Sequence, residues 1–391
     1  MDPFRTNDLP YWVALHTVYQ LGSARFALLE RAFPSMEAAW RADAGQLAAA
    51  GLDARTIQTV QAARAETSPE AEMEQLAAAG VTALARPGPG YPDRLREIPD
   101  APPVLYLKGS WLPEDDWSLA VVGTRRHTPY GHQATAELVE GLAQHRVTIV
   151  SGLARGIDTI AHQTALERGG RTVAVLANGL DIVYPPDNRQ LAERIVERGA
   201  LVSDYPLGTR PRAEYFPRRN RILSGLAVGT LVVEADYKSG AMITARTATE
   251  QNREVFAVPG SIFSLQSRGP LSLIRDGAIP VTRAEDMLEA LNLTMLGAQL
   301  DFSRAAPPES ESERAVFAAL QREPQHIDEV VRTSGLAASV VSGTLALLEL
   351  KGLARDVGGM QYVRLREPAA EYSSDPTVFQ GTRPAGERAA N

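Results

Sequence analysis

Short apolar runs alternate with segments of helical pattern across residues 118–291, and this alternation constrains the fold more than any other feature of the chain. Strands that alternate with helices of about 10–15 residues form βαβ units, in which parallel strands carry helices on both faces. We therefore expect an α/β fold with a doubly wound parallel sheet, whose strand-end loops meet at one edge. The apolar runs are residues 118–122, 147–150, 172–177, 200–204, 230–235, 254–258 and 278–281.

The sequence on either side of this region predicts two smaller domains. The N-terminal part reads as short helices with Ser35 and Asp53 as N-caps, a packing or docking module or one that contacts phosphate through loop amides. The C-terminal part reads as three helices and a hairpin, the pattern of a winged helix. The expected boundaries are a helical module over 1–85, the sheet domain over 86–296, a polar linker over 297–311, a winged helix over 312–366 and a disordered tail over 367–391.

Composition excludes several classes of protein. The chain has no cysteine, so disulfide scaffolds, thiolate metal sites and thiol nucleophiles are excluded. No apolar run approaches the ~20 residues of a membrane span, and the first residues lack the pattern of a signal peptide. We expect a cytoplasmic protein without a membrane span, a metal or a cofactor.

Basic residues are concentrated in one segment, although the formal net charge is −7. Residues 210–221 hold five arginines against one glutamate. Local charge decides binding because salt screens charges over about 8–10 Å. Arginine suits phosphate oxygens and also stacks on bases.

Three strand ends carry glycines, hydroxyls and cations, which together indicate an anion site. Glycine lets the backbone approach a ligand, while amide N–H groups and the following helix dipole favour its negative charge. A tight strand-to-helix turn is the alternative for any one loop. The loops hold Gly123, Thr124, Arg125 and Arg126 after the first run, Ser151, Gly152, Arg155 and Gly156 after the second, and Lys238, Ser239 and Gly240 after the fifth.

None of these loops has the spacing of a dinucleotide fingerprint or of a P-loop, and no catalytic residue is assigned. Asp158 and His162 lie four residues apart on one predicted helix, a spacing that suits a metal pair, but no third ligand is evident, and we favour helix packing or a hydrogen bond between the two side chains. Asp204 and Glu234 stand at predicted strand ends. Three roles suit an acid there: a catalytic base, a cap for a loop, or an ion pair with Arg219 or Arg221. We favour the ion pair.

Two further patterns bear on nucleic acid. Phe216 stands among arginines, which suits base stacking in a single strand, although a core position for the ring remains the alternative. The candidate recognition helix of the expected winged helix, residues 337–350, has no basic residue before Lys351. A duplex reader needs polar or basic side chains there, so this helix indicates protein docking or weak backbone contact.

Long, ordered motifs in this sequence resemble those of the DprA/Smf family, the DNA-processing protein A of natural transformation. Over residues 10–366 they include YPDRLREIPDAPPVLYLKG, VVGTRRHTPYG, VSGLARGIDTIAHQTAL, LANGLDIVYPPDNRQL, YPLGTRPRAEYFPRRNRILSGL and EADYKSGAMITARTATEQNREVFAVPG. Thr124 stands where serine is common, and Asp204 where many members have glutamate. Neither change removes a donor that the site needs.

The resemblance implies an extended Rossmann-like domain that binds single-stranded DNA, dimerises and loads the recombinase RecA onto DNA coated by single-strand-binding protein, without catalysis. Homodimer, RecA and single-strand-binding protein are thus the expected partners. The matching site residues are Gly123, Thr124, Arg125, Ser151, Gly152, Phe216, Arg218, Arg219, Asn220, Arg221, Lys238, Ser239 and Gly240, with Asn188 and Arg189 at the rim and Leu271, Leu273 and Ile274 as a dimer face.

Two other functions remain open at this point. Related Rossmann-like pockets hydrolyse nucleotides or phosphoribosyl compounds, although residues 258–261 lack the loop that those enzymes use. A transcriptional regulator that acts through the winged helix is the third interpretation, and the absence of basic residues from the candidate recognition helix argues against it.

Overall fold

The computed structural model describes residues 8–291 apart from residue 19, and residues 310–364 apart from residues 322–323, 351–352 and 357–358. The chain divides into two compact units, residues 1–294 and 295–391. The expected tail and nearly all of the expected linker lie outside the described residues. A helix begins at Glu311, inside the range expected for the linker.

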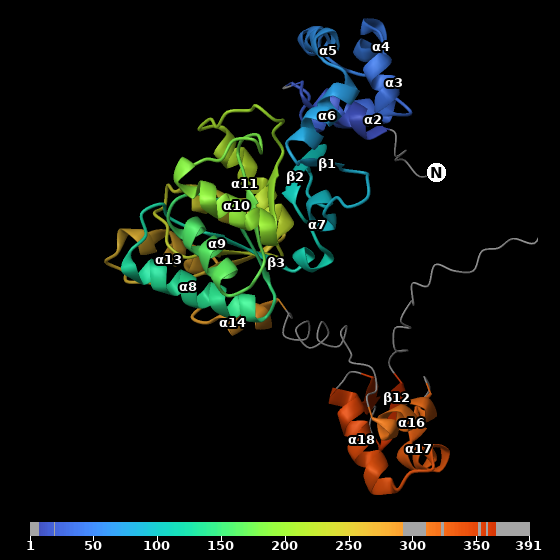
Figure 1. Ribbon diagram of the computed structural model, residues 1–391. Coiled ribbons are helices and arrows are strands. Elements are labelled where there is room, and N and C mark those ends of the chain that lie inside the picture. Colours follow the sequence, from blue (N-terminus) through green and yellow to red (C-terminus); the bar gives the residue numbers. More distant parts are fainter. Residues whose placement is uncertain are drawn as a thin grey trace, which may run out of the picture. The chain divides into compact units, whose positions relative to one another are not determined.

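Nine strands of the described part of the first unit form one sheet, in the order β1-β2-β6-β5-β4-β3-β7-β8-β9. Figure 1 labels β1, β2 and β3 of this sheet and several of the helices around it. Strands β3 to β9 pair in parallel, whereas β1 pairs with β2 and β2 with β6 in antiparallel fashion. Each predicted apolar run holds a strand, so the doubly wound sheet is confirmed. The strands are β1 (Thr82–Ala85), β2 (Val104–Gly109), β3 (Ser118–Val122), β4 (Thr148–Ser151), β5 (Thr172–Val175), β6 (Ala200–Ser203), β7 (Gly229–Val232), β8 (Glu254–Ala257) and β9 (Ile279–Pro280).

Helices cover both faces of this sheet because its strands are apolar on both sides. On β5, Ala174 packs in the core that α10 supplies, whereas Val173 and Val175 pack in the core of α11 and α12. Successive side chains of a strand point to opposite faces, so these helices lie on opposite sides of the sheet. The helices are α8 (Pro129–Gln144), α9 (Ile157–Glu167), α10 (Arg189–Arg198), α11 (Tyr215–Leu226), α12 (Gly240–Glu250), α13 (Arg268–Arg275) and α14 (Ala284–Ala290).

The N-terminal helices pack directly onto the sheet domain. Trp12 and Phe26 belong to the same buried cluster as Tyr106 of β2 and Leu201 of β6. The two expected caps are confirmed, because the side chain of Ser35 accepts a hydrogen bond from Ala38 N and that of Asp53 accepts one from Thr56 N. The helices are α1 (Leu9–His16), α2 (Ser23–Ala32), α3 (Met36–Arg41), α4 (Ala44–Ala49), α5 (Ala54–Glu66), α6 (Pro69–Ala78) and the short α7 (Asp93–Arg96).

The edge of the sheet is where the sequence reasoning fell short. No strand was expected over residues 86–109, but β2 lies there, and β1 lies inside the range expected to be helical. Short strands with no clear alternation leave a weak signal, and only the pairing of β1 with β2 and of β2 with β6 gives them their identity.

The second unit has a core of its own, which includes Val316, Leu345, Leu348 and Leu353. Its three helices and its three-stranded sheet, in the order β10-β12-β11, confirm the winged helix. The elements are α16 (Glu311–Ala319), α17 (Ile327–Ser334), α18 (Ala338–Leu350), β10 (Gln325–His326), β11 (Ala354–Asp356) and β12 (Gln361–Arg364). Among the described residues, no single helix has the length and apolarity of a membrane span; only α17 and α18 taken together do, and the break between them bends by 108°.

Candidate functional site

A pocket of about 370 Å³ lies where the order of strands in the sheet reverses. From β3 the chain adds β4, β5 and β6 on one side, and then β7, β8 and β9 on the other. Loops that leave β3 and β7 therefore diverge and open a crevice at the carboxyl edge, the usual ligand position in such sheets. This switch-point pocket is lined by Val122, Gly123, Thr124, Arg125, Arg126, Ala154, Asp158, Phe216, Pro217, Arg219, Asn220, Leu223, Ser239, Gly240, Ala241 and Thr244.

Backbone contacts hold the pocket loops together. Thr124 N donates to the Glu234 carbonyl at 2.6 Å, and Ile157 N donates to the Thr124 carbonyl at 3.2 Å. Gly156 has a φ of +83°, and a Cβ there would lie 2.3 Å from the Thr124 carbonyl oxygen. Only glycine fits this close approach, so the loops after β3 and β4 form one preorganised wall.

Arg219 forms the floor of the pocket. Its side chain is 4% exposed, and its Nη2 donates to the Gly152 carbonyl at 3.1 Å. Burial lowers the pKa of this guanidinium to about 10, so it stays protonated at neutral pH. Its Nε is buried without a hydrogen-bond partner, an arrangement that costs stability.

Asp158 lies beside this cation and is committed to the loop after β4. One of its oxygens accepts the N–H groups of Gly152 and Ala154 at 3.1 and 3.3 Å. Burial raises the pKa of Asp158 to about 6, against the opposing effect of Arg219. His162 instead lies 2.6 Å from Thr172 Oγ1 through its Nδ1. Asp158 and His162 thus bind different partners, and the described residues hold no cluster of three metal-ligating side chains.

Phe216 faces the pocket. Its ring is half-buried, and the Arg125 guanidinium carbon lies 5.6 Å from its centroid. The exposed ring of Tyr184 lies 5.8 Å from it at 57°. Aromatic rings and an arginine at an open rim form a stacking surface for flat groups. Sequence reasoning missed Tyr184, although an aromatic residue directly before two prolines in a loop was the available signal.

The chain matches known proteins along most of its length. The model of a family described as DNA recombination-mediator protein A matches residues 83–292, and one described as DprA winged helix domain matches residues 301–360. Protein Smf of Synechocystis sp. is 36% identical over 92% of this chain and 99% of its own length. Protein Smf of Escherichia coli is 43% identical over 71% of this chain and 75% of its own length.

The chain belongs to the DNA recombination-mediator protein A family. Among solved structures, DNA processing protein A from Streptococcus pneumoniae is similar at 34% identity and a TM-score of 0.63. The likeness covers 72% of this chain and 97% of that one. The resemblance that the motifs indicated is thereby confirmed.

The family motifs do not all reach the pocket. Nine of the expected residues line it: Gly123, Thr124, Arg125, Arg126, Phe216, Arg219, Asn220, Ser239 and Gly240. Asn220 Nδ2 also donates to the Gly240 carbonyl at 3.2 Å, which ties α11 to the start of α12. Ser239 Oγ is buried without a hydrogen-bond partner. Lys238 is exposed beside it and is not among the lining residues.

Three expected residues serve the scaffold instead. Ser151 is buried and its Oγ donates to the Val121 carbonyl at 2.6 Å, and Gly152 lies beneath Arg219, where a Cβ would lie 1.9 Å from Nη1. The amide of Asn188 donates to the Leu153 carbonyl at 2.8 Å. Motif matching did not predict these roles. Buried backbone groups of a loop need hydrogen-bond partners inside the protein, and these side chains supply them. Arg189 is exposed at the start of α10.

The two strand-end acids behave differently from each other. Asp204 Oδ2 pairs with Arg221 Nη2 at 2.6 Å, as favoured, and burial raises the pKa of this carboxyl group. Glu234 was also expected to pair with arginine, and that expectation is wrong. Its carboxylate accepts hydrogen bonds from the backbone N–H and the hydroxyl of Thr128, and so caps the loop before α8.

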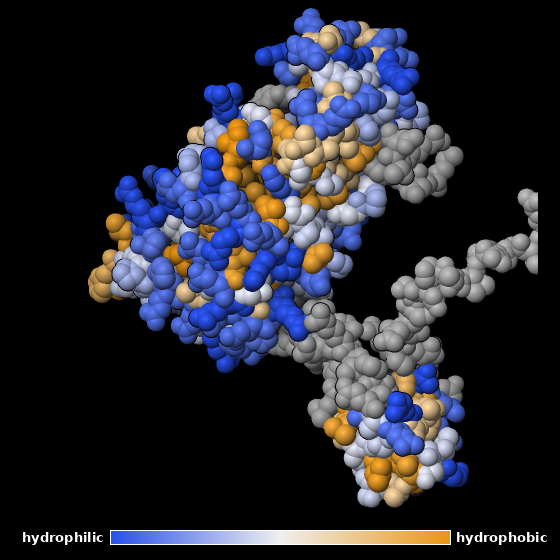
Figure 2. Space-filling model, viewed as in Figure 1, coloured by the Kyte–Doolittle hydropathy of each residue, from blue (hydrophilic) through white to orange (hydrophobic). Residues whose placement is uncertain are grey.

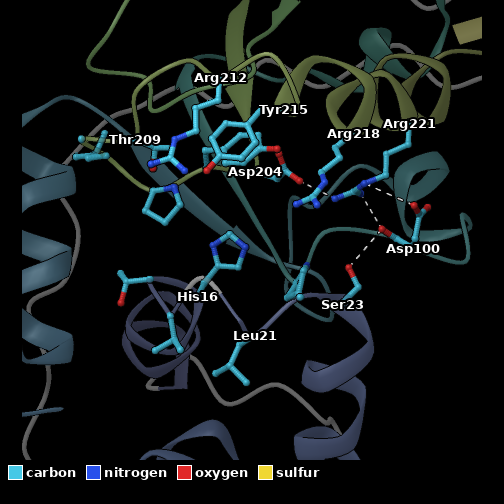
Figure 3. A pocket seen from close by; sticks show the side chains of 18 of the residues that line it. His16, Leu21, Ser23, Asp100, Asp204, Thr209, Arg212, Tyr215, Arg218 and Arg221 are labelled. Carbon is cyan, nitrogen blue, oxygen red and sulfur yellow. Dashed lines mark hydrogen bonds and ion pairs between the residues drawn. The ribbon is translucent and has the colours of Figure 1, made fainter. Parts of the chain in front are cut away.

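Arg218 and Arg221 line a second, larger cavity on the other side of α11 (Figure 3). Arg221 is held by Asp204 and by the Asp100 carbonyl, which it reaches at 2.7 Å. The basic segment that the sequence treats as one element therefore divides between two cavities.

Proposed function

We propose that this chain binds single-stranded DNA at the switch-point pocket and acts as a recombination mediator that protects incoming strands and loads RecA onto them, in transformation and in repair. Membership of the recombination-mediator family supports the proposal, as does the name DNA processing protein A of its solved relative. The observation that carries it is the Arg125 guanidinium over the Phe216 ring, in a pocket that the buried cation of Arg219 also lines.

The chemistry of the pocket favours an unpaired strand over a duplex. The Phe216 ring at the rim can stack only on a base that is not paired with a second strand. Such stacking tolerates any sequence. A cavity of about 370 Å³ has room for a nucleotide and not for a double helix. We therefore expect little sequence preference at this pocket and strong weakening by salt.

The test measures the affinity of an oligothymidylate as a function of salt. Arg125→Ala and Lys238→Ala should each weaken binding and reduce the salt slope by about one, because each removes one phosphate contact. Arg194→Ala is the matched control, since this exposed arginine of α10 lines neither cavity. Unchanged binding curves for both Arg125→Ala and Lys238→Ala would refute the assignment.

We propose binding without catalysis. Among the residues that line the pocket, Asp158 is the sole carboxylate, and it accepts two backbone N–H groups. A general base must instead reach the proton that it abstracts. Incubation with nucleotides tests this: release of free base by the wild-type protein, lost in Asp158→Asn, would support a hydrolase instead.

We also propose a cytoplasmic homodimer that assembles at the α13 edge, with RecA and single-strand-binding protein as partners. Leu271, Leu273 and Ile274, the expected dimer face, are half-buried, and Leu273 packs against the core. The loop before α13 exposes Phe263 (89%) and Ile262 (75%), and apolar side chains gather at this edge in Figure 2. Large exposed apolar groups indicate an interface.

Phe263→Glu places a charge in this interface and should convert the dimer to a monomer, as measured by light scattering. An unchanged mass would contradict this proposal.

A further inference from the structure

The first turns of α11 separate two cavities. Phe216 and Arg219 face the switch-point pocket, whereas Arg218 and Arg221 face the second cavity, and Pro217 lines both. Residues that are adjacent on a helix differ by about 100° in direction, so one basic segment supplies both sides. A DNA strand that crosses Pro217 would therefore pass from one cavity to the other while it stays in contact with the N-terminal turns of α11.

The second cavity has a volume of about 990 Å³ and lies between the N-terminal helices and the loop after β6. We call it the inter-module cavity. His16 and Leu21 lie on its helical wall, and Arg212 and Tyr215 lie opposite (Figure 3). This volume is at the upper end for small-molecule sites, so a nucleotide fits with room for solvent.

Its wall holds a stacked pair of aromatic rings next to a cation. The rings of Tyr205 and Tyr215 have centroids 4.5 Å apart; Tyr215 is buried at 3% exposure, so the half-buried Tyr205 is the ring open to an occupant. The guanidinium carbon of Arg212 lies 5.8 Å from the Tyr215 centroid, and this side chain is exposed. An aromatic surface beside an arginine suits a base together with its phosphate.

A buried carboxylate supplies a second, independent observation. The Asp204 side chain is 10% exposed and lines the cavity. One oxygen pairs with Arg221, but Oδ1 has no hydrogen-bond partner. A buried acceptor without a donor is costly, so an occupant that carries N–H groups is favoured over one that carries only acceptors.

We propose that the inter-module cavity binds a further nucleotide of the same single strand, with its base against Tyr205, an amino group of the base donating to Asp204 Oδ1, and its phosphate beside Arg212. This inference rests on the proposed function. Unlike the switch-point pocket, this subsite discriminates between bases. Cytosine offers an amino group, which a carboxylate accepts, whereas the N–H of thymine lies between two carbonyl oxygens that repel the carboxylate.

The experiment compares oligodeoxycytidylate with oligothymidylate at neutral pH, lengthened one nucleotide at a time. The wild-type protein should bind both equally while the strand is short, and should prefer cytidylate by roughly tenfold once the strand reaches the second cavity. Asp204→Asn places an amide N–H₂ where Oδ1 stands and should abolish or reverse that preference. Equal affinities at every length would overturn the proposal.

Arg212→Ala keeps the test independent of the buried network, because Arg212 is exposed. This variant should weaken the binding of long strands and reduce their salt slope by about one, and leave short strands unaffected. Arg194→Ala serves again as the control. Failure of the wild-type protein to bind any strand would refute the proposed function itself. Binding in which neither Asp204→Asn nor Arg212→Ala changes the length or base dependence would refute only the second subsite.

Discussion

The switch-point pocket and the exposed face of α18 have opposite chemistry. The pocket joins Arg125, Arg219 and an aromatic rim, whereas α18 exposes Val340 and Leu347, seven residues apart on one face, and has no basic residue along its length. The winged-helix fold is widely associated with duplex readout, which needs basic or amide side chains in the groove. One chain thus carries a winged-helix fold without the side chains that duplex readout needs, so a fold by itself does not establish a binding site.

Removal of the aromatic rim should have the largest effect. Phe216→Ala removes the ring on which a base stacks, and base stacking contributes about 1–3 kcal/mol. We expect the affinity for an oligothymidylate to fall roughly 5- to 150-fold in fluorescence anisotropy, with a nearly unchanged salt slope because no charge is lost.

Leu347→Ala on α18 is the matched control, since it removes a large apolar side chain from the surface of the other unit. We expect no change in strand affinity for this variant. Equal losses in both variants would mean that the two surfaces do not differ as proposed.

A smaller effect should come from pH. Burial raises the pKa of Asp158 to about 6, so this carboxyl group is ionised above pH 6 and becomes neutral below it. Loss of a negative charge beside Arg219 makes the pocket more attractive to phosphate. The affinity should therefore rise roughly two- to fivefold as the pH falls from 7.5 to 5.5.

Asp158→Asn isolates this contribution. Both backbone N–H bonds go to one oxygen of Asp158, so the amide oxygen can keep them. The exposed imidazole of His127 in the loop after β3 remains in both proteins, and the difference between the two pH profiles reports on Asp158. Superimposable profiles would show that the Asp158 carboxyl group has no effect on the affinity for single-stranded DNA.

The smallest expected signal is from the winged helix alone. The second unit has its own core, so residues 310–366 should fold as an isolated fragment. In a gel-shift assay this fragment should leave duplex DNA unshifted at physiological salt. A specific duplex shift would break the comparison and restore the regulator hypothesis.

Much of the fold followed from the sequence. Strictly alternating apolar runs and helical segments predicted β3 to β9 and the helices between them, since the burial of strands on both faces leaves a continuous apolar signal. The strand-end loops with Gly123 and Ser239 were predicted to meet for the same topological reason. The antiparallel strands β1 and β2 lacked this signal, because pairing and not composition defines them.

The sequence predicted most of the residues that line the pocket, but it did not predict which of them make internal hydrogen bonds. Ser151 and Asn188 were expected to face a ligand, but the loops use them as internal hydrogen-bond partners. Glu234 was expected to pair with arginine and instead caps a loop. A local sequence gives the polar group but not the buried donor or acceptor nearest to it in space.

The order of residues along the chain determined the class of fold, the family motifs and the concentration of arginine before and within α11. Tertiary structure decided which arginines act together. The helical rotation of about 100° per residue sends Arg219 under the switch-point pocket and Arg221 into an ion pair with Asp204 on the other side of α11. The physical reason is that the interactions of a charged side chain depend on the groups packed around it. Those groups come from strands and helices that are far apart in the sequence.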